Sequence, residues 1–201
     1  MYRGSGPRVL PLIIAIIVIA LVIAALVTVG RMLFSGGGDT DPKKDAPGTS
    51  LQDTTLERTA DRSVRWTVRG PIVADEKYRS YQITVSPNSR MYVTYSGYLE
   101  QVISTKSYDN NAKAYEEFVY ALDKAAIGKT RNDPTAEFRG VCATQGVAYM
   151  YETLKNNDAD NSVWSSTCKD SPGTMGADPL KIQALFVNQI PDFNPLFNQI
   201  Y

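Results

Sequence analysis

The first pattern along the chain is an unbroken apolar run near the N-terminus. Residues 9–29 are Leu, Ile, Val and Ala with one proline and one threonine, and none of them is charged. About 20 helical residues cross the roughly 30 Å hydrocarbon core of a bilayer, and a helix satisfies its own backbone polar groups in lipid. We therefore predict a single transmembrane helix over residues 9–30, which attaches the chain to the bilayer.

A cleaved secretory signal peptide is the alternative interpretation of this run, with Arg3 and Arg8 as its basic start. Signal peptides have an apolar stretch of only about 7–15 residues and end in a small-residue cleavage site. This run is longer and continues into Gly30, Arg31 and Met32, so an uncleaved anchor is favoured. A small excess of basic residues before the run predicts cytoplasmic residues 1–8 and a C-terminal domain outside the cell membrane.

Residues 31–60 are predicted to be a flexible linker between the anchor and a domain over residues 61–201. From Ser35 onward the segment has no aromatic residue and is rich in Gly, Pro, Asp and Lys. Such a composition buries too little apolar surface to order itself. As a flexible coil, residues 35–60 would span about 28 Å on average.

After the linker, apolar and polar residues alternate, as in half-buried strands. Val64, Trp66 and Val68 fall on one face of the first such segment, opposite Arg65 and Arg69. Turn-forming residues separate the segments. The predicted strands lie at 63–69, 79–86 and 90–95, the last continued over 98–105, and in a second hairpin at 146–154 and 162–168 around a polar turn at 156–161.

Two segments instead have the period of a helix. Residues 112–126 carry an apolar stripe that follows candidate capping residues at 109–111. Asp178 and Pro179 predict a second helix start, which ends before Pro191, and the tail 192–201 is apolar enough to pack. The fold class is therefore α+β, of order roughly βββ-α-ββ-α, with an antiparallel sheet and the helices on one face.

Cys142 and Cys168 are the two cysteines of the chain, and both fall in the predicted outer domain. An even pair in an extracytoplasmic domain predicts one disulfide, which would contribute about 3 kcal/mol. Two buried free thiols in a cytosolic domain are the alternative.

Charge and composition exclude several functions. The chain has 21 basic and 21 acidic residues, without the basic excess that nucleic-acid binding needs. It has no histidine, so Ser-His-Asp catalysis and His-ligated zinc are excluded, and no cofactor is expected.

Two short motifs are weak. Ser166 to Lys169 matches Ser-x-x-Lys without its partner motifs. Asp158 to Ser162 resembles the start of a calcium loop, but Val163 and Lys169 stand where glycine and a bidentate acid are needed, so a solvated turn is favoured.

Aromatic residues supply the candidate binding surface. The chain has 12 tyrosines, several of them on predicted strands. Aromatic residues suit sheets in general, and they are also enriched at interfaces, so they predict either core or an exposed platform for glycan or protein. The candidates are Tyr92, Tyr95, Tyr98, Tyr149, Tyr151 and Trp164.

The favoured function is a single-pass envelope protein that displays a small, non-enzymatic binding domain outside the membrane. Its partners would be the bilayer, through residues 9–30, and an envelope protein or glycan. One alternative is an accessory subunit of a membrane assembly. Another is a small enzyme that acts on glycan through two carboxylates, with candidates by residue type alone at Glu100, Glu116, Glu117, Glu137 and Glu152.

Overall fold

The computed structural model describes residues 50–98, 100–132, 137–142, 145–169 and 171–198. They belong to one compact unit, Gly48–Tyr201. The predicted cytoplasmic residues 1–8, the predicted membrane span 9–30 and the linker up to residue 49 lie outside the described residues. Among the helices that are described, none has the length and apolar character needed to cross a bilayer.

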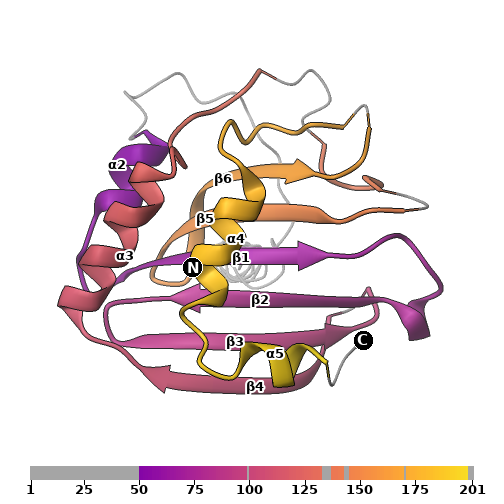
Figure 1. Ribbon diagram of the computed structural model, residues 1–201, viewed down its shortest axis with the longest axis horizontal. Coiled ribbons are helices and arrows are strands. Elements are labelled where there is room, and N and C mark those ends of the chain that lie inside the picture. The colour runs from indigo at the N-terminus through magenta and orange to yellow at the C-terminus, as the bar shows by residue number, and fades with distance from the viewer. Residues whose placement is uncertain (1–49, 99, 133–136, 143–144, 170, 199–201) are drawn as a thin grey trace, which may run out of the picture. The chain divides into compact units, whose positions relative to one another are not determined.

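A six-stranded antiparallel sheet forms the centre of the domain (Figure 1). Its spatial order is β4-β3-β2-β1-β5-β6, so β1 to β4 form a meander and β5 pairs with the opposite side of β1. The predicted α+β class with an antiparallel sheet is confirmed. The strands are β1 (Arg62–Arg69), β2 (Arg79–Val85), β3 (Ser89–Ser96), β4 (Gln101–Asp109), β5 (Ala148–Lys155) and β6 (Asp158–Ser166), with a 3₁₀ turn, η1 (Asp75–Lys77), before β2.

The alternation of side chains along β1 places its apolar residues on the face of the sheet that forms the core. Trp66 lies opposite Ile83 of β2 and Tyr151 of β5, and all three are fully buried. Because opposite residues in an antiparallel sheet share a face, the registers of three strands bring these large side chains into one layer.

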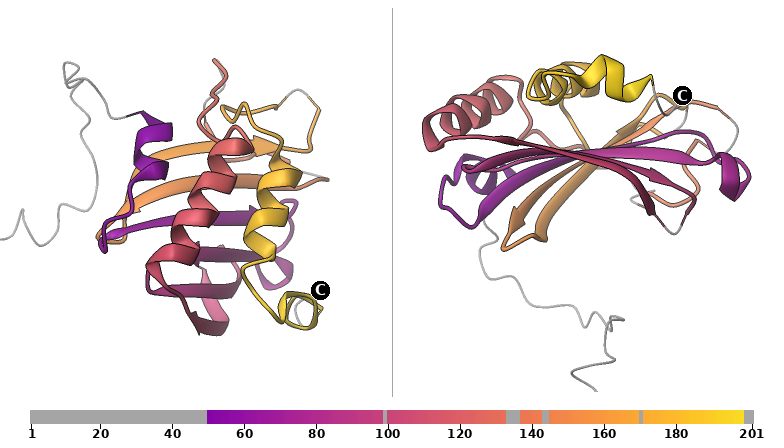
Figure 2. Two further views of the ribbon diagram at one scale, coloured as in Figure 1. Left: turned by 60° about the vertical axis from the view of Figure 1, so that its left-hand side comes forward. Right: turned by 90° about the horizontal axis from the view of Figure 1, so that it is seen from below.

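Helices cover this face of the sheet, and among the described residues no helix lies on the other face (Figure 2). They are α3 (Ala112–Lys124), α4 (Pro179–Val187) and α5 (Phe193–Phe197). The ring of Phe186 in α4 lies 5.8 Å from Trp66 and 5.1 Å from Phe118 of α3. Asp178 caps α4 through its side chain, as predicted, and Asn111, one of the three candidates at 109–111, caps α3.

A helix that the sequence did not firmly predict precedes the sheet. α2 (Leu51–Leu56) begins with a capping box between Ser50 and Asp53. Its Leu51 is buried in the core, and the Thr55 hydroxyl lies 2.8 Å from the buried Tyr151 hydroxyl. Residues 50–60, assigned above to the linker, therefore pack as part of the compact unit, because contacts with β5 order a segment too polar to order itself.

The sheet contains one strand more than the order βββ-α-ββ-α. The predicted continuation of β3 over 98–105 is instead a separate edge strand, β4, paired antiparallel with β3. Gly97 (φ +68°) and Glu100 (φ +53°) lie in the turn that reverses the chain from β3 to β4. The positive φ angles make Gly97 part of a turn.

The hairpin of β5 and β6 is tighter than predicted. Asn156 and Asn157 both have positive φ and form the turn alone, so Asp158 and Asp160 lie on β6. The Asp160 carboxylate accepts a hydrogen bond from Thr153 at 2.6 Å and pairs with Arg62. Within the described ranges no group of three or more His, Cys, Asp or Glu side chains could hold a metal ion.

The Asp160 pair predicts a pH dependence of stability. Partial burial raises the pKa of Asp160, but the hydrogen bonds from Thr153 and Arg62 outweigh it, so the pKa is lowered. A lowered pKa stabilises the fold above the unfolded value of about 3.9, and the stabilisation is lost as pH falls through the folded pKa. The difference in unfolding free energy between wild type and Asp160→Asn should therefore be largest near neutral pH and shrink below about pH 4. Urea denaturation at several pH values measures it, and a difference independent of pH would contradict this assignment.

Candidate functional site

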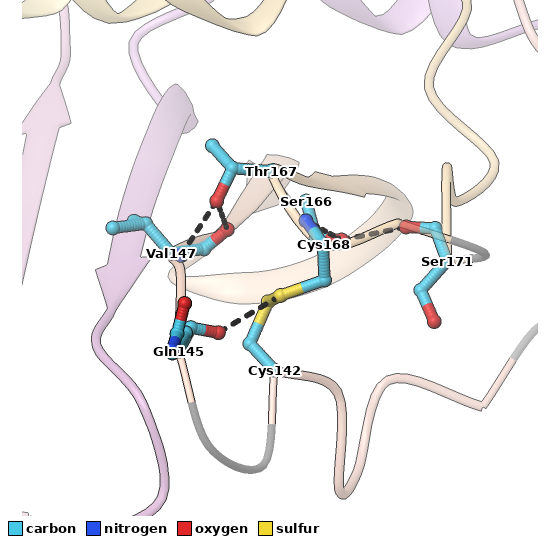
Figure 3. Close-up of a disulfide and its surroundings, with 7 residues drawn as sticks. All are labelled: Cys142, Gln145, Val147, Ser166, Thr167, Cys168 and Ser171. Atoms are coloured by element: carbon cyan, nitrogen blue, oxygen red, sulfur yellow. Dashed lines mark hydrogen bonds between the residues drawn. A yellow bond between two sulfur atoms is a disulfide. The ribbon is translucent and has the colours of Figure 1, made fainter.

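The disulfide between Cys142 and Cys168 is present, as predicted from the sequence (Figure 3). The sulfur atoms are 2.05 Å apart and the Cα atoms 5.6 Å apart. It joins the segment before β5 to the chain that leaves β6. The described residues 137–142, which belong to no helix or strand, are thereby attached to the end of the sheet.

Short hydrogen bonds hold the strand ends beside the disulfide. The Val147 backbone N–H donates to Thr167 Oγ1 at 2.9 Å, and the Cys168 N–H donates to Ser166 Oγ at 3.1 Å (Figure 3). Cys168 Sγ also lies 3.0 Å from the Gln145 carbonyl oxygen, a contact only, since an oxidised sulfur carries no proton to donate. The disulfide is therefore attached to an ordered backbone.

Gly146 is required beside the disulfide. Its φ is +90°, and a Cβ there would lie 2.6 Å from Cys168 Sγ and 2.7 Å from Thr167 Oγ1. Gly146→Ala is expected to lower the free energy of unfolding by about 1–3 kcal/mol through backbone strain and this clash. Gly140→Ala is the matched control in urea denaturation, because Gly140 also has positive φ (+77°) but nothing within 4 Å of its would-be Cβ. Equal losses of unfolding free energy in Gly146→Ala and Gly140→Ala would show that the close contact of the added Cβ with Cys168 and Thr167 adds no further destabilisation.

A pocket of about 230 Å³ opens at the same end of the sheet, where β1 ends and β2 and β5 begin. Segments from four parts of the chain form it. Its lining residues are Arg69, Gly70, Ile72, Tyr78, Tyr98, Phe138, Arg139, Gly140, Val141 and Ala148. We call this pocket the aromatic groove.

One wall of the aromatic groove is a pair of stacked tyrosines. The rings of Tyr78 and Tyr98 are 4.1 Å apart between centroids. The Tyr98 hydroxyl donates to the Val73 carbonyl at 2.7 Å and accepts from the Val73 N–H at 3.0 Å. Tyr98 is thus held in place although it is 45% exposed, and the neighbouring Ile72 is 43% exposed.

A second wall of the aromatic groove is Phe138, which comes from the segment attached by the disulfide. Its ring lies 5.2 Å from the Arg69 guanidinium and 5.6 Å from the ring of Trp164. Trp164 is buried on β6 behind it. The disulfide and Trp164 therefore fix the position of an aromatic side chain in an otherwise irregular segment.

The charged groups at the aromatic groove are paired with one another. Arg69 donates to Glu100 at 2.9 Å, and Arg139 donates to Glu137 at 2.9 Å. Hydrogen bonds from the guanidinium and the backbone N–H of Arg139 lower the pKa of Glu137 to about 2. The groove therefore offers mainly apolar and aromatic surface to a ligand.

No family model matches this chain. The search of curated proteins found no significantly similar sequence either.

A larger hollow of about 670 Å³ lies beside the disulfide. It is lined by glycines, small polar side chains and Lys169, with Val141 as its one branched apolar residue. It has no aromatic wall, and the aromatic groove is the better candidate for recognition, since aromatic side chains dominate binding energies.

Of the six candidate aromatic residues, two belong to this site. Tyr98 lines the aromatic groove and Trp164 supports it from behind. Tyr95 lies on the face of the sheet without helices, and its hydroxyl donates to Gln82 Oε1 at 3.0 Å. The other three are buried in the core under the helices, so the six do not form one exposed platform: Tyr92, Tyr149 and Tyr151.

Most residues of the aromatic groove were not predicted from the sequence. Ile72 and Tyr78 lie between predicted strands, and Phe138 lies between the predicted helix 112–126 and the predicted strand 146–154, in a stretch where no element was predicted. A large apolar residue inside a polar segment is a weak signal for a tertiary contact. Phe138 is the one phenylalanine in the sequence between the end of α3 and the start of β5.

The five candidate glutamates are each paired with a basic side chain. Glu152 accepts from Arg65 at 2.7 Å, and Glu117 lies 2.9 Å from Lys113. Glu100, Glu116 and Glu137 pair with arginines in the same way.

Proposed function

We propose that this protein is a membrane-anchored module that binds another envelope protein through the aromatic groove. The observation that carries the proposal is the combination of exposed apolar side chains with polar groups that already have partners. Ile72 and Tyr98 are exposed, while the Tyr98 hydroxyl uses both its donor and an acceptor site on Val73.

This pattern favours a protein ligand over a glycan. A sugar carries several hydroxyl groups, and its site needs unpaired donors and acceptors to satisfy those that become buried. Arg69 and Arg139, the charged side chains that line the groove, are engaged with Glu100 and Glu137. An apolar side chain of a partner protein needs only the surface that Ile72, Tyr98 and Phe138 supply.

The rigidity of the walls also supports binding. Tyr98 is fixed by three hydrogen bonds, two to Val73 and one from its own N–H to Asp75 at 2.8 Å. Phe138 is held between Arg69 and Trp164. A site ordered before binding loses less conformational entropy when a partner arrives.

The anchor remains a prediction from residues 9–29, and it gives the module its location at the outer surface of the cell membrane. The disulfide is consistent with that side of the membrane, because disulfides persist in oxidising compartments.

Site-specific photocross-linking tests the proposal. A benzophenone amino acid at Ile72, in the full-length protein in its native membrane, should give one discrete protein adduct. The same group at Leu180, which is 62% exposed on α4, is the control for random collisions. Adding Tyr98→Ser should abolish the Ile72 adduct by removing one wall of the groove.

Identical adducts at Ile72 and Leu180, or an Ile72 adduct that survives Tyr98→Ser, would overturn the groove as the binding site. An adduct that resists protease and is removed by glycan hydrolysis would establish a glycan ligand in place of a protein.

A further inference from the structure

The donors and acceptors at the aromatic groove are unevenly placed. Arg69 and Arg139 line the groove, while their carboxylate partners, Glu100 and Glu137, do not. Among the described residues that line it, none is Asp, Glu, Asn, Gln, Ser or Thr. Apart from the tyrosine hydroxyls, the described side chains of the groove therefore present hydrogen-bond donors to a ligand and no acceptors.

Both guanidinium groups keep N–H groups that can bind a ligand. Arg69 donates to Glu100 from Nη2 at 2.9 Å, and Arg139 donates to Glu137 from Nε at 3.1 Å and from Nη2 at 2.9 Å. A guanidinium group carries further N–H donors in its plane. Since Arg69 lies over the ring of Phe138, these donors stand beside an aromatic wall. A matching ligand combines exposed acceptors with apolar rings and has few donors of its own.

A proline-containing segment in the polyproline II conformation has this chemistry. It makes no internal hydrogen bonds, so its carbonyl oxygens stay available, and proline has no N–H that would need an acceptor in the groove. A helix or a paired strand has already used its carbonyl groups in its own hydrogen bonds. Proline-rich segments accordingly dock in grooves lined by aromatic side chains.

The walls of the groove suit such a segment in shape. The ring of Tyr98, which is 45% exposed, stacks on the buried Tyr78 and forms a flat apolar surface. The volume of about 230 Å³ is below the roughly 300–1,000 Å³ of most small-molecule sites. The groove therefore suits a few side chains of a longer chain better than a complete small ligand.

We propose that the aromatic groove binds a proline-containing segment of its partner protein in the polyproline II conformation. Its proline rings pack on Tyr98 and Phe138, and one of its carbonyl oxygens accepts a hydrogen bond from Arg69. The inference rests on the proposed function, since it names the kind of segment through which the partner binds at that site. Because proline keeps the segment extended before binding, little conformational entropy is lost in the complex.

Fluorescence polarisation of a labelled decaproline peptide tests the chemistry of the groove, with the full-length protein in detergent. Decaproline is a polyproline II helix about 31 Å long, and a flexible Gly-Ser peptide of the same length is the control ligand. Decaproline should bind about tenfold more tightly than the Gly-Ser peptide. Phe138→Ala should weaken decaproline binding about tenfold, whereas Tyr120→Ala, at a 44% exposed tyrosine on α3, should leave it unchanged.

A matched pair of arginine variants tests the hydrogen bond to the ligand. Arg58 has the same two kinds of contact as Arg69, because it lies 5.7 Å from the ring of Tyr120 and pairs with Glu116. Arg69→Met should weaken decaproline binding about tenfold, and Arg58→Met should not change it. Both arginine side chains are partly exposed, so unchanged thermal melts are expected and would show that each variant is folded.

Equal binding of the two peptides, or equal effects of Phe138→Ala and Tyr120→Ala, would overturn the proposal. Unchanged binding in Arg69→Met would overturn the hydrogen bond from the guanidinium group to the carbonyl oxygen.

Competition in the native membrane separates this inference from the proposed function. An excess of decaproline should suppress the photoadduct at Ile72, and the Gly-Ser peptide should not. An adduct that persists in excess decaproline would leave the protein-binding function intact and overturn the proline-containing ligand. If no adduct forms at Ile72 although decaproline binds as expected, the proposed function fails and the preference of the groove for proline stands.

Discussion

A domain that begins at residue 61 should be about 2.5–6 kcal/mol less stable than one that begins at Gly48, because α2 is missing. Burial of Leu51 stabilises the fold by about 1.5–3 kcal/mol. Without Thr55, the buried Tyr151 hydroxyl loses its partner, which costs about 1–3 kcal/mol more. Domains of this size are stable by only about 5–15 kcal/mol. Urea denaturation of the two domains measures the difference.

Thr55→Val in the longer domain separates the two contributions. It keeps the volume and removes the hydroxyl, so about 1–3 kcal/mol of the loss is expected from the hydrogen bond alone. If the two domains unfold at the same urea concentration, α2 does not contribute to the core, and residues 50–60 belong to the linker after all.

Removal of the disulfide by Cys142→Ser and Cys168→Ser together should destabilise the domain by about 3 kcal/mol, since the unfolded chain regains the entropy of an open loop. A second effect is expected at the aromatic groove. Phe138 lies four residues before Cys142, so without the disulfide the wall of the groove that Phe138 forms should lose its fixed position. The photoadduct at Ile72 should then disappear.

Phe186→Leu is the matched control for the second effect. It removes part of a large buried side chain from the core under α4, away from the groove. The loss of unfolding free energy should be comparable to that on removal of the disulfide. The Ile72 photoadduct should persist in Phe186→Leu at temperatures where the domain is folded. If both variants lose the adduct, it reports overall stability, and the disulfide has no particular role at the groove.

Local pattern was sufficient for most elements of the fold. The alternation around Trp66 predicted β1, the candidate caps at 109–111 placed the start of α3 to within three residues, and Asp178 placed the start of α4. These signals depend on residues close in sequence, whose effects on the backbone do not need the rest of the molecule. Residues 98–105 were predicted to continue β3, but the chain turns at Gly97 and forms the separate strand β4, because a glycine within a strand pattern is compatible with a continued strand or with a turn.

The binding site depended on contacts between distant residues. Tyr98 and Tyr149 both lie on or beside strands, yet one is exposed and the other is buried. Which face of the sheet the helices cover decides the difference, and sequence alternation alone does not reveal it. Phe138 gains its place only through Trp164 and Arg69, both remote in the sequence.

The sequence by itself determined the α+β class, the pairing of Cys142 with Cys168 and the expectation of an anchor over residues 9–30, because each follows from composition or short-range pattern. Only the tertiary structure decided that α2 packs with the domain, that Tyr92, Tyr149 and Tyr151 belong to the core, and that β4 is an open edge. Burial and strand order arise when remote segments meet, and their free energy depends on surfaces that no single segment contains.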